Sequence, residues 1–87
     1  MSEKYIYLYG TQSLPFGLSV LEDEIDARLD GVGEVTGAGS GHRGWHIDVE
    51  YASTVDDAFV VACLVDVLQS LGVAEDVVFD INGHTKS

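Results

Sequence analysis

Phenol, imidazole and carboxylate side chains alternate with apolar ones in two strand-like segments, residues 4–9 and 45–51. The polar members are Tyr5, Tyr7, Tyr9, His46, Asp48 and Glu50. A period of two places alternate side chains on opposite faces of a strand. If the two segments are neighbours in one sheet, the three tyrosines lie beside His46, Asp48 and Glu50. Asp80 of a last strand is then close by. Such a surface can receive Lys or Arg through ring faces and charge-assisted hydrogen bonds. Tyrosines that are half-solvated only because of their strand propensity are the alternative.

Catalysis and metal binding have weaker support from these residues. His46 has acidic neighbours, but the sequence defines no pocket in which it could act as an acid or base. His42 and His46 would be roughly 13 Å apart in an extended strand, too far to share one ion unless the turn folds back. Neither Ser40 nor Cys63 has a credible base beside it. We therefore expect no enzyme, no metal site and no cofactor.

The segment 39–44 matches the pattern G-x-G-x-x-G. A dinucleotide site needs that turn to open a helix, whereas here it joins two predicted strands. A hairpin with positive φ angles is therefore the favoured interpretation. His42 and Arg43 at its tip form a small basic spot that could meet a ligand.

The charge of the chain restricts its partners. Fifteen Asp and Glu against four Lys and Arg give a formal net charge of -11. Nucleic acid and anionic membrane surfaces would be repelled, and no run approaches the ~18 apolar residues of a membrane span. A basic protein would be attracted. The alternative is that the acidic surface keeps a small domain soluble or reflects a salt-adapted source.

Cysteine usage and the first residues indicate a cytoplasmic protein. Cys63 is the single cysteine, so no intramolecular disulfide can form. Residues 1–4 lead into a strand-like run without the apolar core of a signal peptide.

The elements that must position these groups follow from the hydrophobic pattern. We predict strands at 4–9, 34–38, 45–51 and 77–81, one helix from a Ser19–Glu22 capping box to about Val32, and another from an N-cap at Thr54 to about Leu71. This order predicts one α+β domain of ferredoxin-like type over residues 1–87, with loose ends at 1–3 and 83–87. Its four-stranded antiparallel sheet has both helices on one face, and its first and third strands are central neighbours.

The two helices differ in their outer faces. The acidic residues of the first helix that could meet a partner are Glu22, Asp23, Asp26 and Asp30. The second helix contains eight consecutive apolar residues, 58–65, which cover its whole circumference. We expect Ala58, Val61, Ala62, Val65 and Leu68 to pack on the sheet. The remaining apolar residues, left for the first helix or for a second copy of the chain, are Phe59, Val60, Cys63 and Val67.

In size, acidity and predicted order of elements, the chain resembles the small acidic immunity proteins with which bacteria block their own secreted toxins. The resemblance implies that the chain masks a toxin's active site or substrate-binding surface by complementary charge. It implies that the acidic helix or the tyrosine–carboxylate face makes the contact. We therefore expect a non-catalytic toxin-neutralising or similar inhibitory protein. The alternative is a small-molecule-sensing or regulatory module that acts as a dimer, suggested by the apolar second helix and the glycine hairpin.

Overall fold

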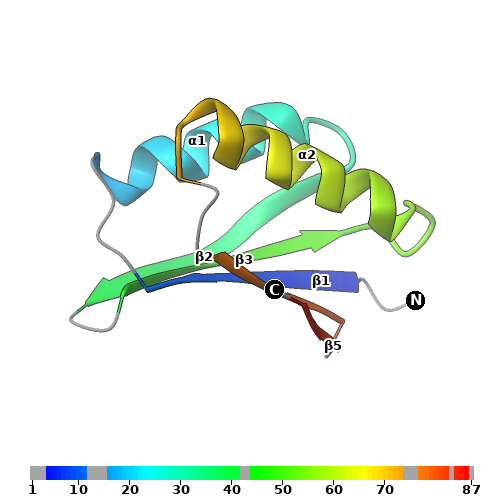
Figure 1. Cartoon of the computed structure of the whole chain (residues 1–87). Coiled ribbons are helices and arrows are strands. Elements are labelled where there is room, and N and C mark those ends of the chain that lie inside the picture. The colour runs from blue at the N-terminus through cyan, green and yellow to red at the C-terminus, as the bar shows by residue number, and fades with distance from the viewer. Residues whose placement is uncertain (1–3, 12–15, 42–43, 74–76, 83, 87) are drawn as a thin grey trace.

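Two helices cover one face of an antiparallel sheet (Figure 1). The computed structural model describes residues 4–11, 16–41, 44–73, 77–82 and 84–86. Its elements are β1 (Lys4–Gly10), α1 (Leu18–Arg28), β2 (Gly33–Gly41), β3 (Gly44–Tyr51), α2 (Asp57–Ser70), β4 (Val77–Ile81) and β5 (His84–Lys86). The strand order is β2-β3-β1-β4-β5. The ferredoxin-like arrangement is therefore confirmed, with β1 and β3 as central neighbours.

The end of the chain differs from the prediction. Residues 84–86 form the short strand β5 at the sheet edge, so the expectation of a loose tail from residue 83 was wrong for them. Asn82 has a φ of 52°, and its backbone N–H donates to Tyr5 O at 2.9 Å. Its side-chain oxygen accepts from the N–H of Tyr5 at 2.8 Å. This double anchor on β1 fixes the turn from which β5 returns. The expected loose residues 1–3, 83 and 87 lie outside the described residues.

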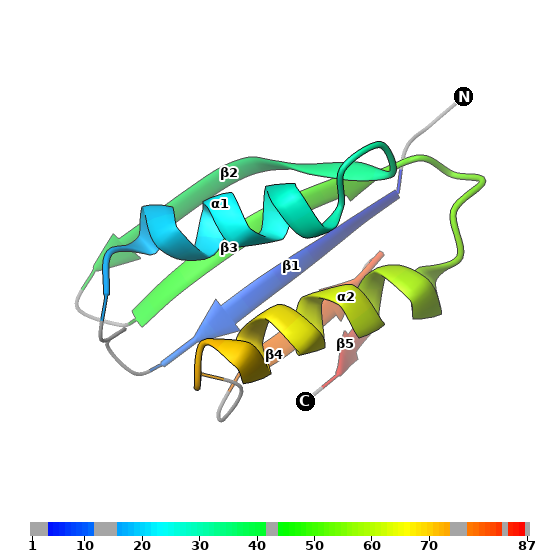
Figure 2. The same ribbon diagram turned by 90° about the horizontal axis from the view of Figure 1, so that it is seen from above.

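The core lies between the sheet and the helices. Ile6 and Leu8 of β1 lie opposite Val49 and Ile47 of β3, and all four side chains are fully buried. The helices contribute Leu21, Ile25, Leu29, Val60, Leu64, Val67 and Leu68. Figure 2 shows α1 over β2 and β3, and α2 over β4. Each such side chain contributes roughly 1.5–3 kcal/mol of apolar transfer free energy, so the strand pattern also dictates which face the helices cover.

Both helix starts differ from the predicted caps. The first helical residue of α1 is Leu18, and its N-cap is Gly17, which makes no side-chain capping bond. Ser19 is therefore inside the first turn instead of preceding it. The N-cap of α2 is Asp56 and not Thr54, because the Asp56 carboxylate accepts from Ala58 N at 3.1 Å.

The rotation of α2 about its axis also differs from the prediction. Its buried residues are Val60, Leu64, Val67 and Leu68. Ala58 and Ala62, expected on the sheet, are exposed. A helix that is apolar around its whole circumference does not reveal which side is buried, and this explains the error.

The rotation decides which residues of the set expected to be left for the first helix or for a second copy remain exposed. Val60 and Val67 are 0% and 2% exposed and belong to the core, so they cannot contact a second copy. Cys63 is half-buried and packs against the core. Phe59 is the member of that set that remains open, with 51% of its surface exposed.

Candidate functional site

The sheet face turned away from the helices, called the open face below, carries polar side chains of both β1 and β3. Three cross-strand pairs line it: Tyr5 opposite Glu50, Tyr7 opposite Asp48, and Tyr9 opposite His46. On the other side of β1, Asp80 of β4 lies opposite Tyr7. Because directly opposite residues share a face, these seven side chains form one surface. The predicted placement is therefore confirmed, whereas a role in binding stays a prediction.

The tyrosines form a continuous aromatic row along β1. The ring centroids of Tyr5 and Tyr7 are 4.6 Å apart with a tilt of 30°. Those of Tyr7 and Tyr9 are 6.4 Å apart in an edge-to-face arrangement. Both geometries are favourable for aromatic pairs, so each ring restrains the next. A restrained phenol loses little conformational entropy when it contacts a partner.

Strand β2 adds a carboxylate that the sequence analysis did not select. The β2–β3 hairpin begins with Gly41 opposite Gly44, and a regular ladder from there would place Val35 opposite Glu50. The register shifts between Val35 and Gly37, so Glu34 lies opposite Glu50 instead. The shift sends Val35 towards the core and Glu34 to the open face. Only a known bulge position would have revealed Glu34.

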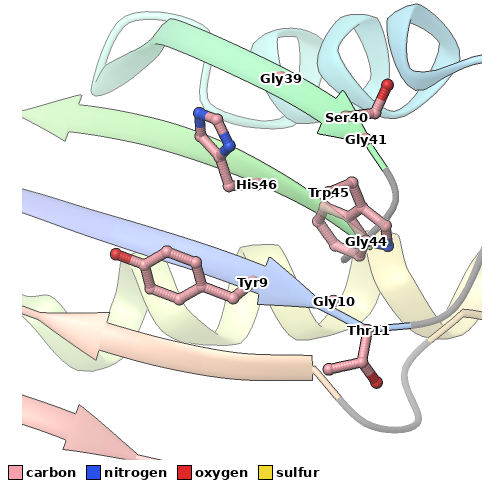
Figure 3. A pocket seen from close by; sticks show the side chains of 9 residues that line it. All are labelled: Tyr9, Gly10, Thr11, Gly39, Ser40, Gly41, Gly44, Trp45 and His46. Carbon is pink, nitrogen blue, oxygen red and sulfur yellow. The ribbon is translucent and has the colours of Figure 1, made fainter.

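Glycines in β2 make room for the polar side chains of β3. A Cβ atom at Gly37 would lie 2.9 Å from Oδ2 of Asp48. A Cβ atom at Gly39 would lie 2.7 Å from Cε1 of His46. The carboxylate and the imidazole therefore lie over the bare backbone of β2, beside the tyrosine row instead of on top of it. Figure 3 shows His46 next to this stretch of β2.

Two hollows on the sheet follow from this arrangement. One, of about 330 Å³, is lined by Tyr5, Tyr7, Thr36, Asp48 and Glu50. The other, of about 590 Å³, lies at the hairpin end of the sheet (Figure 3). The second is lined by Tyr9, Gly10, Thr11, Gly39, Ser40, Gly41, Gly44, Trp45 and His46.

Burial and neighbouring charges raise the pKa of the phenols of Tyr7 and Tyr9. Partial burial is the largest cause that raises the pKa of Tyr7, followed by Tyr5 and by the carboxylates of Asp48, Asp80 and Glu50. The pKa of Tyr9 is also raised, mainly by partial burial and then by the charges of Asp80 and Asp48. The phenols of Tyr7 and Tyr9 therefore remain hydrogen-bond donors and neutral ring surfaces at physiological pH.

The acidic residues of α1 lie on the other side of the sheet, in the helix layer. Asp23, Asp26 and Asp30 are exposed and Glu22 is half-buried. Asp26 has a structural contact, since its Oδ1 accepts from the N–H of Val35 at 2.8 Å. The predicted partner-binding residues thus form two separate surfaces, and one flat contact cannot cover both.

The cationic side chains that the structure describes are already paired in the helix layer. Nζ of Lys4 is 2.8 Å from Oδ1 of Asp57 and donates to Val55 O at 2.7 Å. Arg28 of α1 pairs with Asp66 of α2. Neither of these two side chains neutralises the open face.

The described residues offer little to other kinds of site. They contain no group of three or more His, Cys, Asp or Glu that could hold a metal ion. Gly39 and Gly44 lie on the two strands of a hairpin, and Gly44 has a φ of 117°, as the hairpin interpretation of the glycine motif predicts. The basic spot predicted at His42 and Arg43 lies outside the described residues. In the same described part of the chain, no helix is both long and apolar enough to cross a membrane.

Comparisons with protein-family models, with curated proteins and with solved structures find no match to this chain.

Proposed function

We propose that the chain is a non-catalytic binding protein whose open face covers a basic surface of a partner protein. The observation that carries this proposal is the position of Tyr7, which lies opposite Asp48 on one side and opposite Asp80 on the other. An aromatic row flanked by carboxylates matches the chemistry of Arg and Lys side chains, which pair with carboxylates and lie on ring faces.

The number of aromatic and acidic side chains on the open face suits a protein partner. A single cation–π contact at an exposed site contributes about 0.5–1 kcal/mol, and a hydrogen bond to a charged group about 1.5–3 kcal/mol. Association costs roughly 4–15 kcal/mol in lost freedom, so several such contacts must form together. Three tyrosines and four carboxylates on one sheet face can supply them.

The net charge supports the same class of partner. At -11, the chain attracts a basic surface over long range and raises the rate of association. Association should therefore weaken as salt is added.

An inhibitory role fits a chain that binds by covering a surface. We propose a toxin as the partner and the bacterial cytoplasm as the place of action, on the strength of the resemblance to small acidic immunity proteins. Masking a basic active site or substrate-binding surface would need no chemistry from this chain.

The test begins with the protein that co-purifies with the chain from the cells that make it. Its activity and its affinity are measured with the wild type, with the open-face variant D48N/E50Q, and with the helix-face variant D23N/E24Q, which loses the same charge. We expect inhibition by the wild type and the helix-face variant, and affinity at least about tenfold weaker for the open-face variant. Full inhibition by D48N/E50Q would contradict the proposal.

A second candidate is a regulatory module that acts as a dimer. A groove of about 740 Å³ beside α2 favours it, with a lining that includes Ala58, Val61, Ala62 and Ile81. Sedimentation at several concentrations and a thermal-shift panel of metabolites test this candidate. A monomer that no ligand stabilises would remove it.

A further inference from the structure

We propose that the pocket between Tyr5 and Thr36 on the open face is a recognition site for the guanidinium group of one arginine of the partner. The inference rests on the proposed function and names the side chain that is recognised. The pocket has a volume of about 330 Å³ and is lined by Tyr5, Tyr7, Thr36, Asp48 and Glu50.

The lining offers acceptors in several directions. Asp48 and Glu50 are alternate residues of β3, so their side chains lie on the same face of the sheet. Their Cα atoms are about 7 Å apart along the strand. The other lining residues, Tyr5, Tyr7 and Thr36, each carry a hydroxyl group. A guanidinium carries five N–H donors in a planar fork, whereas an ammonium has three donors around one point. A rim with spread acceptors therefore favours arginine over lysine.

The aromatic part of the lining favours the same choice. The Tyr5 and Tyr7 rings are 4.6 Å apart and tilted by 30°, and they form one wall of the pocket. A planar guanidinium can stack on such a ring and still direct its N–H groups outwards at the carboxylates. A lysine ammonium is more strongly hydrated and gains less from a ring face.

The pocket also carries charge that a bound cation would relieve. Glu34 and Glu50 lie directly opposite each other across β2 and β3, which is an unfavourable pair of like charges. Asp48 is the next acidic residue along the same face. Among the cationic side chains that the structure describes, Lys4 and Arg28 are paired in the helix layer.

Gly37 lies opposite Asp48 and leaves room for its carboxylate beside the pocket. A Cβ atom there would lie 2.9 Å from Oδ2 of Asp48, so Gly37→Ala requires this carboxylate, which lines the pocket, to move. The glycine thus acts as a specificity-determining position although it has no side chain. The substitution displaces one lining carboxylate and leaves the net charge unchanged.

The test compares three peptides that differ at one position. A capped Gly-Gly-X-Gly-Gly peptide with X as arginine, lysine or citrulline is titrated into the 15N-labelled chain at low ionic strength. We expect arginine to bind about tenfold more tightly than lysine, and citrulline, which is neutral, to bind least. The largest shifts should fall on the rings of Tyr5 and Tyr7 and on the amides of residues 36, 48 and 50.

Variants separate the pocket from the general acidity of the chain. D48N, E50Q and Gly37→Ala should each weaken arginine binding several-fold, whereas the controls E24Q on α1 and Gly41→Ala should not. A Cβ atom at Gly41 would have no atom within 4 Å. Amide spectra of each variant verify that the fold is intact. If Gly37→Ala does not fold, the two charge variants decide the question.

The outcomes distinguish this inference from the proposed function. Equal affinity for arginine and lysine at this face would overturn the guanidinium pocket and leave the proposed function in place. No shift with any peptide would likewise overturn the pocket and leave the proposed function in place, because that function depends on several contacts formed together. Shifts confined to the helix layer would contradict both.

Discussion

Tyr7 and Asp48 lie directly opposite each other on the two central strands, on the sheet face that the helices leave uncovered. Their neighbours Leu8 and Ile47 form the adjacent pair, which is fully buried under the helices. A slip of one residue between the strands would bury Asp48 and expose Ile47. The register that builds the core therefore also builds the open face.

The end of β1 provides a first prediction. A Cβ atom at Gly10 would lie 2.2 Å from Cε2 of Trp45, so Gly10→Ala must displace the indole or the strand. We expect a loss of about 1–3 kcal/mol in the free energy of unfolding. Urea unfolding followed by the fluorescence of the single tryptophan measures it. Gly41→Ala is the matched control and should change stability by less than about 0.5 kcal/mol. Equal stability of the two variants would contradict the packing described.

A polar network around Tyr51, the last residue of β3, provides a second prediction. Tyr51 is 1% exposed, and its hydroxyl donates to Oδ1 of Asp57 at 2.7 Å and accepts from Nδ2 of Asn82 at 3.2 Å. Tyr51→Phe should cost about 1 kcal/mol of unfolding free energy, a modest value because Asp57 is nearly half exposed. Tyr9→Phe makes the same change at an exposed phenol and should cost less than about 0.5 kcal/mol. The network would be unsupported if the two losses were equal.

The ionisation of Tyr51 provides a third prediction. Burial, followed by the hydrogen bond to Asp57, raises the pKa of Tyr51 to about 12. Because the folded value exceeds the unfolded value of about 10, the contribution to stability is complete below pH ~10 and is lost as pH rises through about 12. Phenolate absorbance during alkaline titration should show a late phase that Tyr51→Phe removes. A late phase that persists in the variant would contradict this assignment.

The rotation of α2 provides a fourth prediction. Leu64 is fully buried, whereas Phe59 is 51% exposed. Leu64→Ala should therefore lower the free energy of unfolding by about 2–5 kcal/mol, and Phe59→Ala should lower it by clearly less. Chemical unfolding of both variants checks the order. A larger loss from Phe59→Ala would show that a different side of the helix is buried.

The sequence predicted those parts of the fold in which apolar and polar residues follow a regular alternation. In β1 and β3 apolar and polar residues alternate strictly, so the pattern defined both faces and the six open-face residues of these strands. Glycines at the ends of the hairpin defined its turn. The fold class followed from the order of these elements.

The remaining features depend on contacts that a single sequence does not reveal. The apolar run of α2 leaves its rotation undefined, and the bulge that brings Glu34 to the open face lies in a strand rich in glycine. Strand β5 depends on the anchor of Asn82 on Tyr5. In the sequence, Asp26 cannot be distinguished from the neighbouring acidic residues of the helix. In the structure its carboxylate accepts a hydrogen bond from the N–H of Val35.

The ring resonances of the four tyrosines show whether the open face is the partner-binding surface. They are followed by NMR while the co-purified basic protein is added. We predict that the resonances of Tyr5, Tyr7 and Tyr9 shift or broaden, while those of the buried Tyr51 stay in place as an internal control. Unchanged open-face tyrosines, with shifts instead at the amides of Asp23 and Glu24 on α1, would contradict the account.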